Sequence, residues 1–334
     1  RLYTNGFLQS FLPGEETIAW GGDQYADFCA TRSSTTFLIG DTWDDTQQGG
    51  WGTGDWGDLR QINYFLDNLP NAKGKVTDAI YLHNEGVGRF WRAYFYYGMV
   101  RTFGDVPWYE TVIQTGDVDL LYKPRDKREF VMDKIIEDLE LAIDKLENKR
   151  ASDQINCWTA LSLLSRVCLY EGTYRKYHTE LNLQGTDMLL EKAYKAAERV
   201  INESGYKLYS TGNVDTDYRD LFASNDLREE EVILGRRYSL ILNKMHNINY
   251  YFTSRTQKDI GLTKDFVDSY LLQSNGKTFT SKTDYKTMGF YEEMQNRDKR
   301  LAQTIRSVGY KRIGDNTVQL PDFAATMTGY QVSK

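Results

Sequence analysis

The chain has 334 residues, of which 40% are hydrophobic and 26% charged, as in a folded protein with a sizeable core rather than a disordered one. Its formal net charge of −6 gives no support to nucleic-acid binding, which needs a concentrated basic face. No apolar run approaches the ~20 residues of a membrane-spanning helix. The three cysteines and three histidines lack metal-site spacing, so the sequence indicates no metal site and no cofactor.

Five helical segments are predicted between residues 53 and 205. The first covers about 55–69, where apolar residues recur every three to four positions and form one stripe. The stripe consists of Trp56, Leu59, Ile62, Phe65, Leu66 and Leu69. This spacing predicts an amphipathic helix with one face against a core.

The second segment, which begins near residue 80, is the most informative one. Residues 89–103 are aromatic or apolar on almost every side, which is typical of a helix buried among other helices. Arg89 and Arg92 lie one turn apart and must reach carboxylates or water. We expect the helix to end at Gly104, because glycine readily adopts the conformation that ends helices.

The remaining three segments alternate between amphipathic and buried patterns. The third follows Pro124, where Asp126 and Glu129 predict a capping box. Its stripe is Val131, Ile135, Leu139, Ala142 and Leu146. The fourth covers about 157–171 and is expected to end at Gly172. The fifth runs from Asp187 to Ser204, with Gly205 as its cap, and its inward positions are Leu190, Ala193, Ala197 and Val200.

Alternating buried and amphipathic helices predict a mostly α fold of antiparallel, tetratricopeptide-like pairs. Small residues would let helices approach closely: Gly98, Ala142 and Ala197. After residue 205 the pattern changes. Short strands are predicted at 206–209 and 231–234, with long aromatic-rich loops at 236–261 and 273–290. We expect the helices to pack against this irregular, loop-rich part.

The best candidate for a ligand site is the segment 41–58. It contains three Trp, five Asp and five Gly but no Lys or Arg. Glycines let the backbone turn sharply, and a Trp on a loop offers a flat apolar face. Carboxylates beside such a face suit a hydroxyl-rich ligand, so we expect a carbohydrate to contact Trp43, Asp44, Asp45 and Trp51.

Structural roles compete with this interpretation. Trp56 falls on the stripe of the first helix and is expected to pack in the core, and Asp44 and Asp45 are also typical of turns. A second candidate is the aromatic run beginning at residue 247, because three adjacent aromatic residues cannot all face one core. Alternating burial on a strand would explain it equally well. Its candidate ligand residues are Asn249, Tyr250, Tyr251 and Phe252.

No catalytic motif supports an enzymatic function. The sequence contains no G-x-S-x-G, no P-loop, no H-E-x-x-H and no G-x-G-x-x-G. A carboxylate pair suited to glycoside hydrolysis is not excluded among so many acids, but no motif indicates one. These absences reduce the expectation of an enzyme without excluding one.

Several ordered blocks together resemble the SusD/RagB family of outer-membrane nutrient-binding lipoproteins of Bacteroidetes. They lie at 63–68, 89–97, 101–107, 160–172, 174–178, 231–234, 296–301 and 328–330. Two positions depart from the family pattern. Val87 replaces a usual Glu, and Lys299 replaces the Pro of the N-R-D-P-R block. Both positions are interpreted as structural, so the resemblance stands.

The resemblance implies a single SusD-like domain over 1–334, with a helical-repeat core at 53–205. The ligand-binding part would comprise 1–52 and 206–334, in a chain shortened at both ends. It also implies no catalysis, and an N-terminal lipid anchor on the outward face of the outer membrane. A SusC-like TonB-dependent transporter would be the partner. No family motif fixes the ligand-binding residues.

We therefore expect a non-catalytic, cell-surface protein that captures an oligosaccharide or polysaccharide. Three alternatives remain open: a RagB-like protein that takes peptides, a helical-repeat scaffold that binds only proteins, and a glycoside hydrolase.

Overall fold

The computed structural model describes residues 27–31, 51–52, 54–239, 241, 255, 260–274, 278–280, 288–307, 309–312 and 314–333. These residues form two compact units. The helical unit contains the described residues up to 208, except 27–31, together with 229–236. The second unit contains 27–31, 209–228 and the described residues from 237 onward. The single domain expected over 1–334 stays a prediction.

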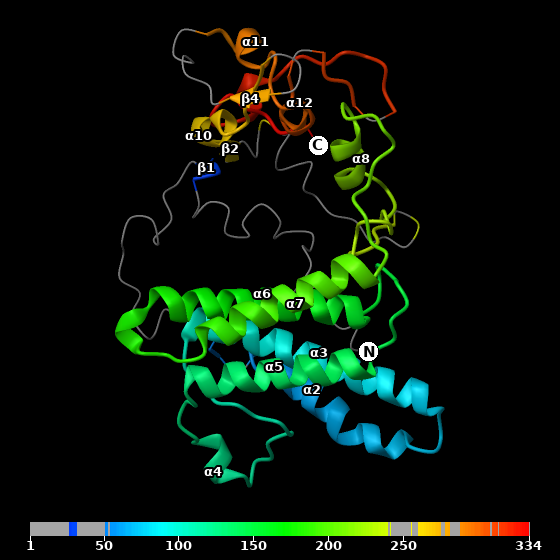
Figure 1. The fold of residues 1–334 in the computed structure, drawn as a ribbon, viewed down its shortest axis with the longest axis vertical. Helices are drawn as coiled ribbons and strands as arrows, with labels where there is room; N and C mark the ends of the chain where they lie inside the picture. Colours follow the sequence, from blue (N-terminus) through cyan, green and yellow to red (C-terminus); the bar gives the residue numbers. More distant parts are fainter. Residues whose placement is uncertain are drawn as a thin grey trace. The chain divides into compact units, whose positions relative to one another are not determined.

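The helical unit is a stack of long helices in which each packs against the next, as Figure 1 shows. The long helices are α2 (Gly57–Asn68), α3 (Asp78–Phe103), α5 (Arg128–Lys145), α6 (Cys157–Tyr177) and α7 (Thr186–Glu203). The short elements are η3 (Leu69–Ala72), α4 (Val118–Leu121) and η4 (Thr179–Leu181). The prediction of a mostly α, tetratricopeptide-like fold is confirmed. No helix among the described residues is long and apolar enough to span a bilayer.

The central helix α3 is buried as its sequence predicts. Phe90, Trp91 and Tyr96 have at most 2% of their surface exposed. The Thr77 hydroxyl accepts a hydrogen bond from the Ile80 amide at the start of α3, which satisfies a free helix donor. Gly104 ends the helix with a φ of 70°, as expected of a glycine at that position.

Helix α5 begins differently from the predicted capping box. Its first amide, that of Arg128, donates to the Asp105 carboxylate at 2.8 Å, across 23 residues of sequence. Asp126 instead accepts from the Trp108 amide at 2.7 Å. The prediction of a capping box was wrong, because a carboxylate from another segment caps the helix. The predicted apolar stripe is correct, since Val131, Ile135, Leu139 and Ala142 are fully buried and Leu146 is 6% exposed.

Three further sequence predictions need correction. The segments 206–209 and 231–234 are not strands, although the Lys207 amide does donate to the Glu230 carbonyl. Helix α6 continues past Gly172 to Tyr177. At two positions of α7 the buried residue lies one place earlier in the sequence than predicted. Leu189 and Ala196 are buried, rather than Leu190 and Ala197.

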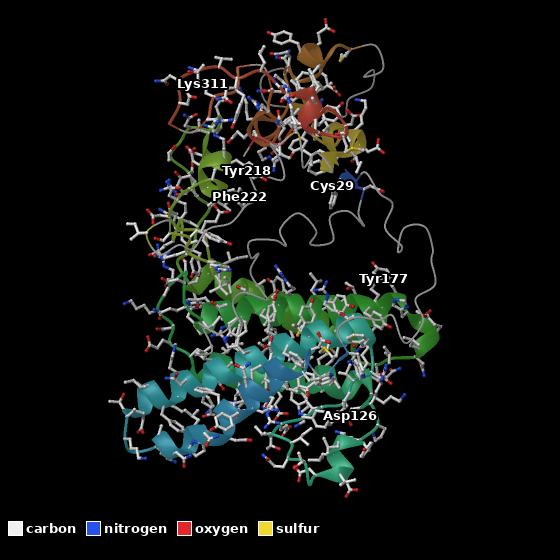
Figure 2. The ribbon with its side chains drawn as sticks, turned by 180° about the vertical axis from the view of Figure 1, so that it is seen from behind. Cys29, Asp126, Tyr177, Tyr218, Phe222 and Lys311 are labelled. Carbon is white, nitrogen blue, oxygen red and sulfur yellow. The ribbon has the colours of Figure 1, made fainter. Side chains whose placement is uncertain are left out.

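The second unit is built from short elements. Strand β1 (Cys29–Thr31) pairs antiparallel with β2 (Ile260–Leu262), and β3 (Leu272–Ser274) pairs antiparallel with β4 (Thr278–Thr280). Its helices are α8 (Asp217–Phe222), α10 (Lys264–Asp268), α11 (Phe290–Glu293), α12 (Lys299–Thr304) and η5 (Phe323–Ala325). Among its described residues, one buried hydrophobic cluster contains Leu262, Val267, Met294, Leu301 and Ile305. Figure 2 labels Tyr218 and Phe222 on α8, whose rings meet edge to face at 5.0 Å.

Candidate functional site

One of the eight ligand residues predicted from the sequence lies in the described part of the chain, and it is Trp51. The other seven lie outside the described residues: Trp43, Asp44, Asp45, Asn249, Tyr250, Tyr251 and Phe252. Trp51 therefore provides the structural starting point for the predicted site.

Trp51 is half-buried against the helical unit. The centre of its ring lies 4.8 Å from that of Phe103, the last residue of α3, and 5.3 Å from that of Trp56, both in T-shaped contacts. The turn after it is closed by two hydrogen bonds. The Gly52 amide donates to the Asp55 carboxylate at 2.8 Å, and the Asp55 amide donates to the Gly52 carbonyl at 3.0 Å. The end of the glycine-rich segment is thus held against α2 and α3.

Trp56 also contacts aromatic residues closer to the core. Its ring lies 5.8 Å from Phe95, which is buried in α3, and 6.1 Å from Tyr109. Trp56 is itself half-buried, so it connects Trp51 to the core. This geometry supports a packing role for Trp56.

An arginine from a distant segment stacks on the Trp51 ring. The guanidinium carbon of Arg125 lies 4.5 Å from the centre of the Trp51 ring, which is within cation–π range. Arg125 belongs to the loop before α5 and is exposed. Arg125 lies 74 positions from Trp51 in the sequence, and no spacing rule connects the two residues. We call Trp51, Trp56, Phe103, Tyr109 and Arg125 the Trp51 cluster.

Two neighbouring lysines are already engaged with acids. Lys123 lies 5.7 Å from the Tyr109 ring centre and pairs with Asp126, labelled in Figure 2, at 2.5 Å. Lys127 pairs with Asp105 at 3.1 Å. Arg125, by contrast, forms no ion pair with a carboxylate in the part of the chain that the structure describes.

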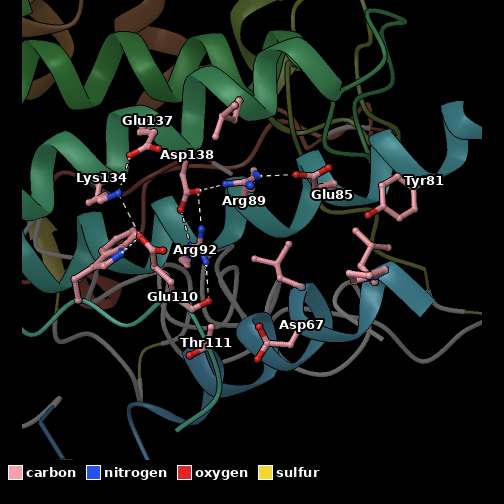
Figure 3. A pocket seen from close by; sticks show the side chains of 15 residues that line it. Asp67, Tyr81, Glu85, Arg89, Arg92, Glu110, Thr111, Lys134, Glu137 and Asp138 are labelled. Atoms are coloured by element: carbon pink, nitrogen blue, oxygen red, sulfur yellow. Dashed lines mark hydrogen bonds and ion pairs between the residues drawn. The ribbon is translucent and has the colours of Figure 1, made fainter. Parts of the chain in front are cut away.

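A second candidate site is a polar pocket of about 410 Å³ between α2, α3 and α5, which Figure 3 shows from close by. No pattern in the sequence analysis predicted it. Its polar lining is Asp67, Tyr81, Glu85, Arg89, Arg92, Glu110, Thr111, Lys134, Glu137 and Asp138. Its remaining lining is Leu66, Leu69, Pro70, Trp108 and Leu141.

Asp138 on α5 is the centre of this pocket. Arg92 donates two hydrogen bonds to it, Nε to Oδ2 at 2.6 Å and Nη2 to Oδ1 at 2.8 Å. Arg89 donates a third, to Oδ1 at 2.9 Å. Both Arg92 and Asp138 are almost fully buried. The prediction that Arg89 and Arg92 reach carboxylates is confirmed, and Figure 3 shows both converging on Asp138.

Two carboxyl groups near this centre, those of Glu85 and Glu110, have a lowered pKa. Partial burial raises the pKa of Glu85, but hydrogen bonds and charges from Arg89 and Lys145 outweigh burial, and the pKa ends below its usual range. A hydrogen bond from the Trp108 indole and the nearby Lys134 lower the pKa of Glu110. Each cation of the pocket therefore already contacts a carboxylate, and the network joins α3 to α5. Among the described residues, no group of three or more acid, His or Cys side chains fits a metal ion.

Comparisons with known proteins agree with this fold. A family model described as SusD-like, starch-binding and associating with the outer membrane matches residues 26–169. A SusD-like protein of Bacteroides ovatus is 26% identical over 193 residues, which are 56% of this chain and 33% of that protein. The chain thus spans about a third of the length of this curated relative.

Solved structures share the fold at low sequence identity. A SusD-like protein of Bacteroides fragilis is 19% identical with a TM-score of 0.65, covering 93% of this chain and 63% of that one. A SusD-like carbohydrate-binding protein of the same species is 16% identical with a TM-score of 0.65, covering 93% and 60%. A structure with xylogluco-oligosaccharide is 18% identical with a TM-score of 0.53, covering 75% and 52%. The family resemblance and the fold class predicted from the sequence are confirmed.

Proposed function

We propose that this chain, a member of the SusD/RagB family, is a non-catalytic binding protein for oligosaccharides or polysaccharides at the cell surface. It would present the captured glycan to a SusC-like TonB-dependent transporter, and an N-terminal lipid anchor would hold it on the outer membrane. The description of the matching family as starch-binding and associated with the outer membrane supports this role.

The observation that carries the proposal is the position of Trp51. It is a half-buried tryptophan at the end of a glycine-rich segment, held by Phe103 and Trp56 on a rigid helical array. An aromatic surface with fixed polar groups beside it suits sugar rings and hydroxyls. A structural neighbour solved with xylogluco-oligosaccharide supports the same ligand class.

The buried cysteines give no support to a covalent mechanism. Burial raises the pKa of Cys157 to about 11 and that of Cys168 to about 12, so both thiols stay protonated near neutral pH. A protonated, buried thiol is a poor nucleophile, which is consistent with binding without catalysis.

The test is binding to a panel of glycans by affinity gel electrophoresis and calorimetry. Wild type is compared with Trp43→Ala, Trp51→Ala and the control Tyr177→Ala, whose side chain is 74% exposed on α6. We expect at least one glycan to bind wild type and the control alike, and to bind both tryptophan variants at least tenfold more weakly. Because Trp51 also packs against α3, circular dichroism and a Trp51→Phe variant separate lost binding from lost folding.

The same panel tests the alternatives. Binding of a glycan that neither tryptophan substitution weakens would place the site elsewhere. Binding of peptides without any glycan would replace the ligand class. Sustained release of reducing ends from a polysaccharide would show that the protein is a hydrolase.

A further inference from the structure

The Trp51 cluster contains a cation that has no acidic partner among the described residues. Arg125 is exposed, and it forms no ion pair with any carboxylate of the described residues. The neighbouring lysines differ from Arg125 in having acidic partners, because Lys123 pairs with Asp126 and Lys127 pairs with Asp105. The exposed Asp55 carboxylate, close in sequence to Trp51, accepts the Gly52 amide.

Two other stacked arginines of the helical unit, Arg92 and Arg128, are paired with carboxylates, whereas Arg101 and Arg150 stack on tyrosines without an ion pair among the described residues. Arg92 lies 5.4 Å from the Trp108 ring centre but is neutralised by Asp138. Arg128 lies 3.7 Å from the Tyr174 ring centre but is neutralised by the buried Glu171. In both cases the guanidinium edge is occupied by a protein carboxylate. The corresponding edge of Arg125 has no such carboxylate among the described residues.

The chemistry of a stacked guanidinium determines which ligand it favours. Contact with the indole restrains the guanidinium, whose fork of N–H donors matches the two oxygens of a carboxylate or sulfate. A tryptophan alone would serve neutral and acidic sugars alike. A tryptophan with an uncompensated arginine gives acidic sugars two additional charge-assisted hydrogen bonds.

Resting on the proposed glycan-binding function, we propose that the Trp51 cluster binds an anionic glycan, whose carboxylate or sulfate group pairs with Arg125. Trp51 then acts as a positioning residue for Arg125 as well as a surface for the sugar ring. The chain as a whole carries a formal charge of −6, so long-range attraction does not favour an acidic ligand. The preference for an anionic sugar must come from this local contact, and removal of one guanidinium is enough to abolish it.

The experiment compares matched ligand pairs by calorimetry. One pair is a galacturonate oligosaccharide and its methyl ester, which differ in the carboxylate charge. The other is a sulfated oligosaccharide and its desulfated form. The proteins are wild type, Arg125→Gln, Arg125→Lys and the control Arg150→Gln. Arg150 is also exposed and stacked, 5.3 Å from the Tyr206 ring centre, but outside the cluster.

We expect wild type and Arg150→Gln to bind the charged member of one pair at least about tenfold more tightly than the neutral member, as charge-assisted hydrogen bonds require. Whichever pair shows the difference identifies carboxylate or sulfate. Arg125→Gln should bind both members equally at the affinity of the neutral one, and Arg125→Lys should keep part of the preference.

Two results would overturn the inference and leave the proposed function intact. One is equal binding of charged and neutral members by wild type, and the other is an unchanged preference in Arg125→Gln. A third result, no binding of any member of the glycan panel, would overturn the proposed function and this inference with it.

Discussion

At the scale of single residues, Asp138 is an almost fully buried carboxylate held between two arginines. Its side chain is 3% exposed and accepts from both Arg89 and Arg92. Three donors converge on one carboxylate, and Arg92 is only 6% exposed, so water can replace little of this pairing. Removal of the negative charge would therefore leave a buried guanidinium unpaired.

We predict that Asp138→Asn lowers the free energy of unfolding by about 3 kcal/mol, the scale of breaking a buried ion pair from one side. The measurement is urea unfolding followed by circular dichroism. The control is Glu137→Gln on the same helix, whose side chain is 57% exposed and which should change stability by less than about 0.5 kcal/mol. Similar losses for both variants would mean that Asp138 has no special role.

A second variant separates charge pairing from packing. Replacing both partners, as in Arg92→Met with Asp138→Leu, removes the uncompensated charge. This double variant should recover part of the stability that Asp138→Asn loses. A double variant less stable than Asp138→Asn would indicate that the geometry of the pair, rather than charge balance, holds α3 to α5.

At the scale of elements, close helix contacts depend on glycines that the sequence analysis did not select. A Cβ on Gly172 would lie 2.8 Å from Leu190 Cδ2, and one on Gly88 would lie 2.6 Å from Leu66 Cδ2. Gly98, expected at a close contact, is exposed, and a Cβ there would meet nothing within 4 Å. Sequence spacing shows that a glycine is in a helix but not which face meets a neighbour.

We predict that substitution by alanine has opposite effects on stability at Gly98 and at Gly172. Gly98→Ala should stabilise the protein by up to about 1 kcal/mol, because alanine favours the helix and has room. Gly172→Ala should destabilise it by about 1–3 kcal/mol, because the new methyl group displaces Leu190 of α7. Urea unfolding of both variants is the measurement. Stabilisation by Gly172→Ala would show that α6 and α7 separate at little cost.

The start of α5 shows why one local rule failed while the helix itself was predictable. The apolar stripe of α5 is a periodic pattern within one segment, and all five of its members are buried. The cap comes from Asp105, which lies outside that segment. A capping box considers only neighbours within four positions, so it cannot detect a carboxylate brought in by the turn after α3. Local pattern predicted the element, and tertiary contact decided how it begins.

At the scale of the whole molecule, the helical array and the family resemblance were predictable from the sequence, whereas only part of the Trp51 cluster could be named from it. Long periodic segments and the aromatic block at 89–103 identified both the fold and the family resemblance. Trp51 was chosen for its residue type and its glycine-rich setting. Arg125 was not, because its approach depends on the path of the chain between α3 and α5. Trp43 and the run 249–252 stay predictions, since they lie outside the described residues.

The two compact units have separate cores, and this separation predicts how the chain unfolds. The helical unit is centred on residues such as Trp91 and Ile135, and the second unit on Leu301 and Ile305. A substitution in one core therefore acts first on its own unit. We expect two thermal transitions in scanning calorimetry. Leu301 is 1% exposed, so Leu301→Ala should reduce the free energy of unfolding of the second unit by about 2–5 kcal/mol. The midpoint temperature of one transition should fall accordingly.

Asp138→Asn should lower the midpoint temperature of the other transition and leave unchanged the transition that Leu301→Ala affects. A control at Tyr291, which is 57% exposed in the second unit, should move neither when changed to Ala. The opposite outcome is a single transition whose calorimetric and van't Hoff enthalpies agree and which both core variants shift together. Such a result would establish that one cooperative domain extends over 1–334, as the family resemblance implies, and that the two cores fold only as a pair.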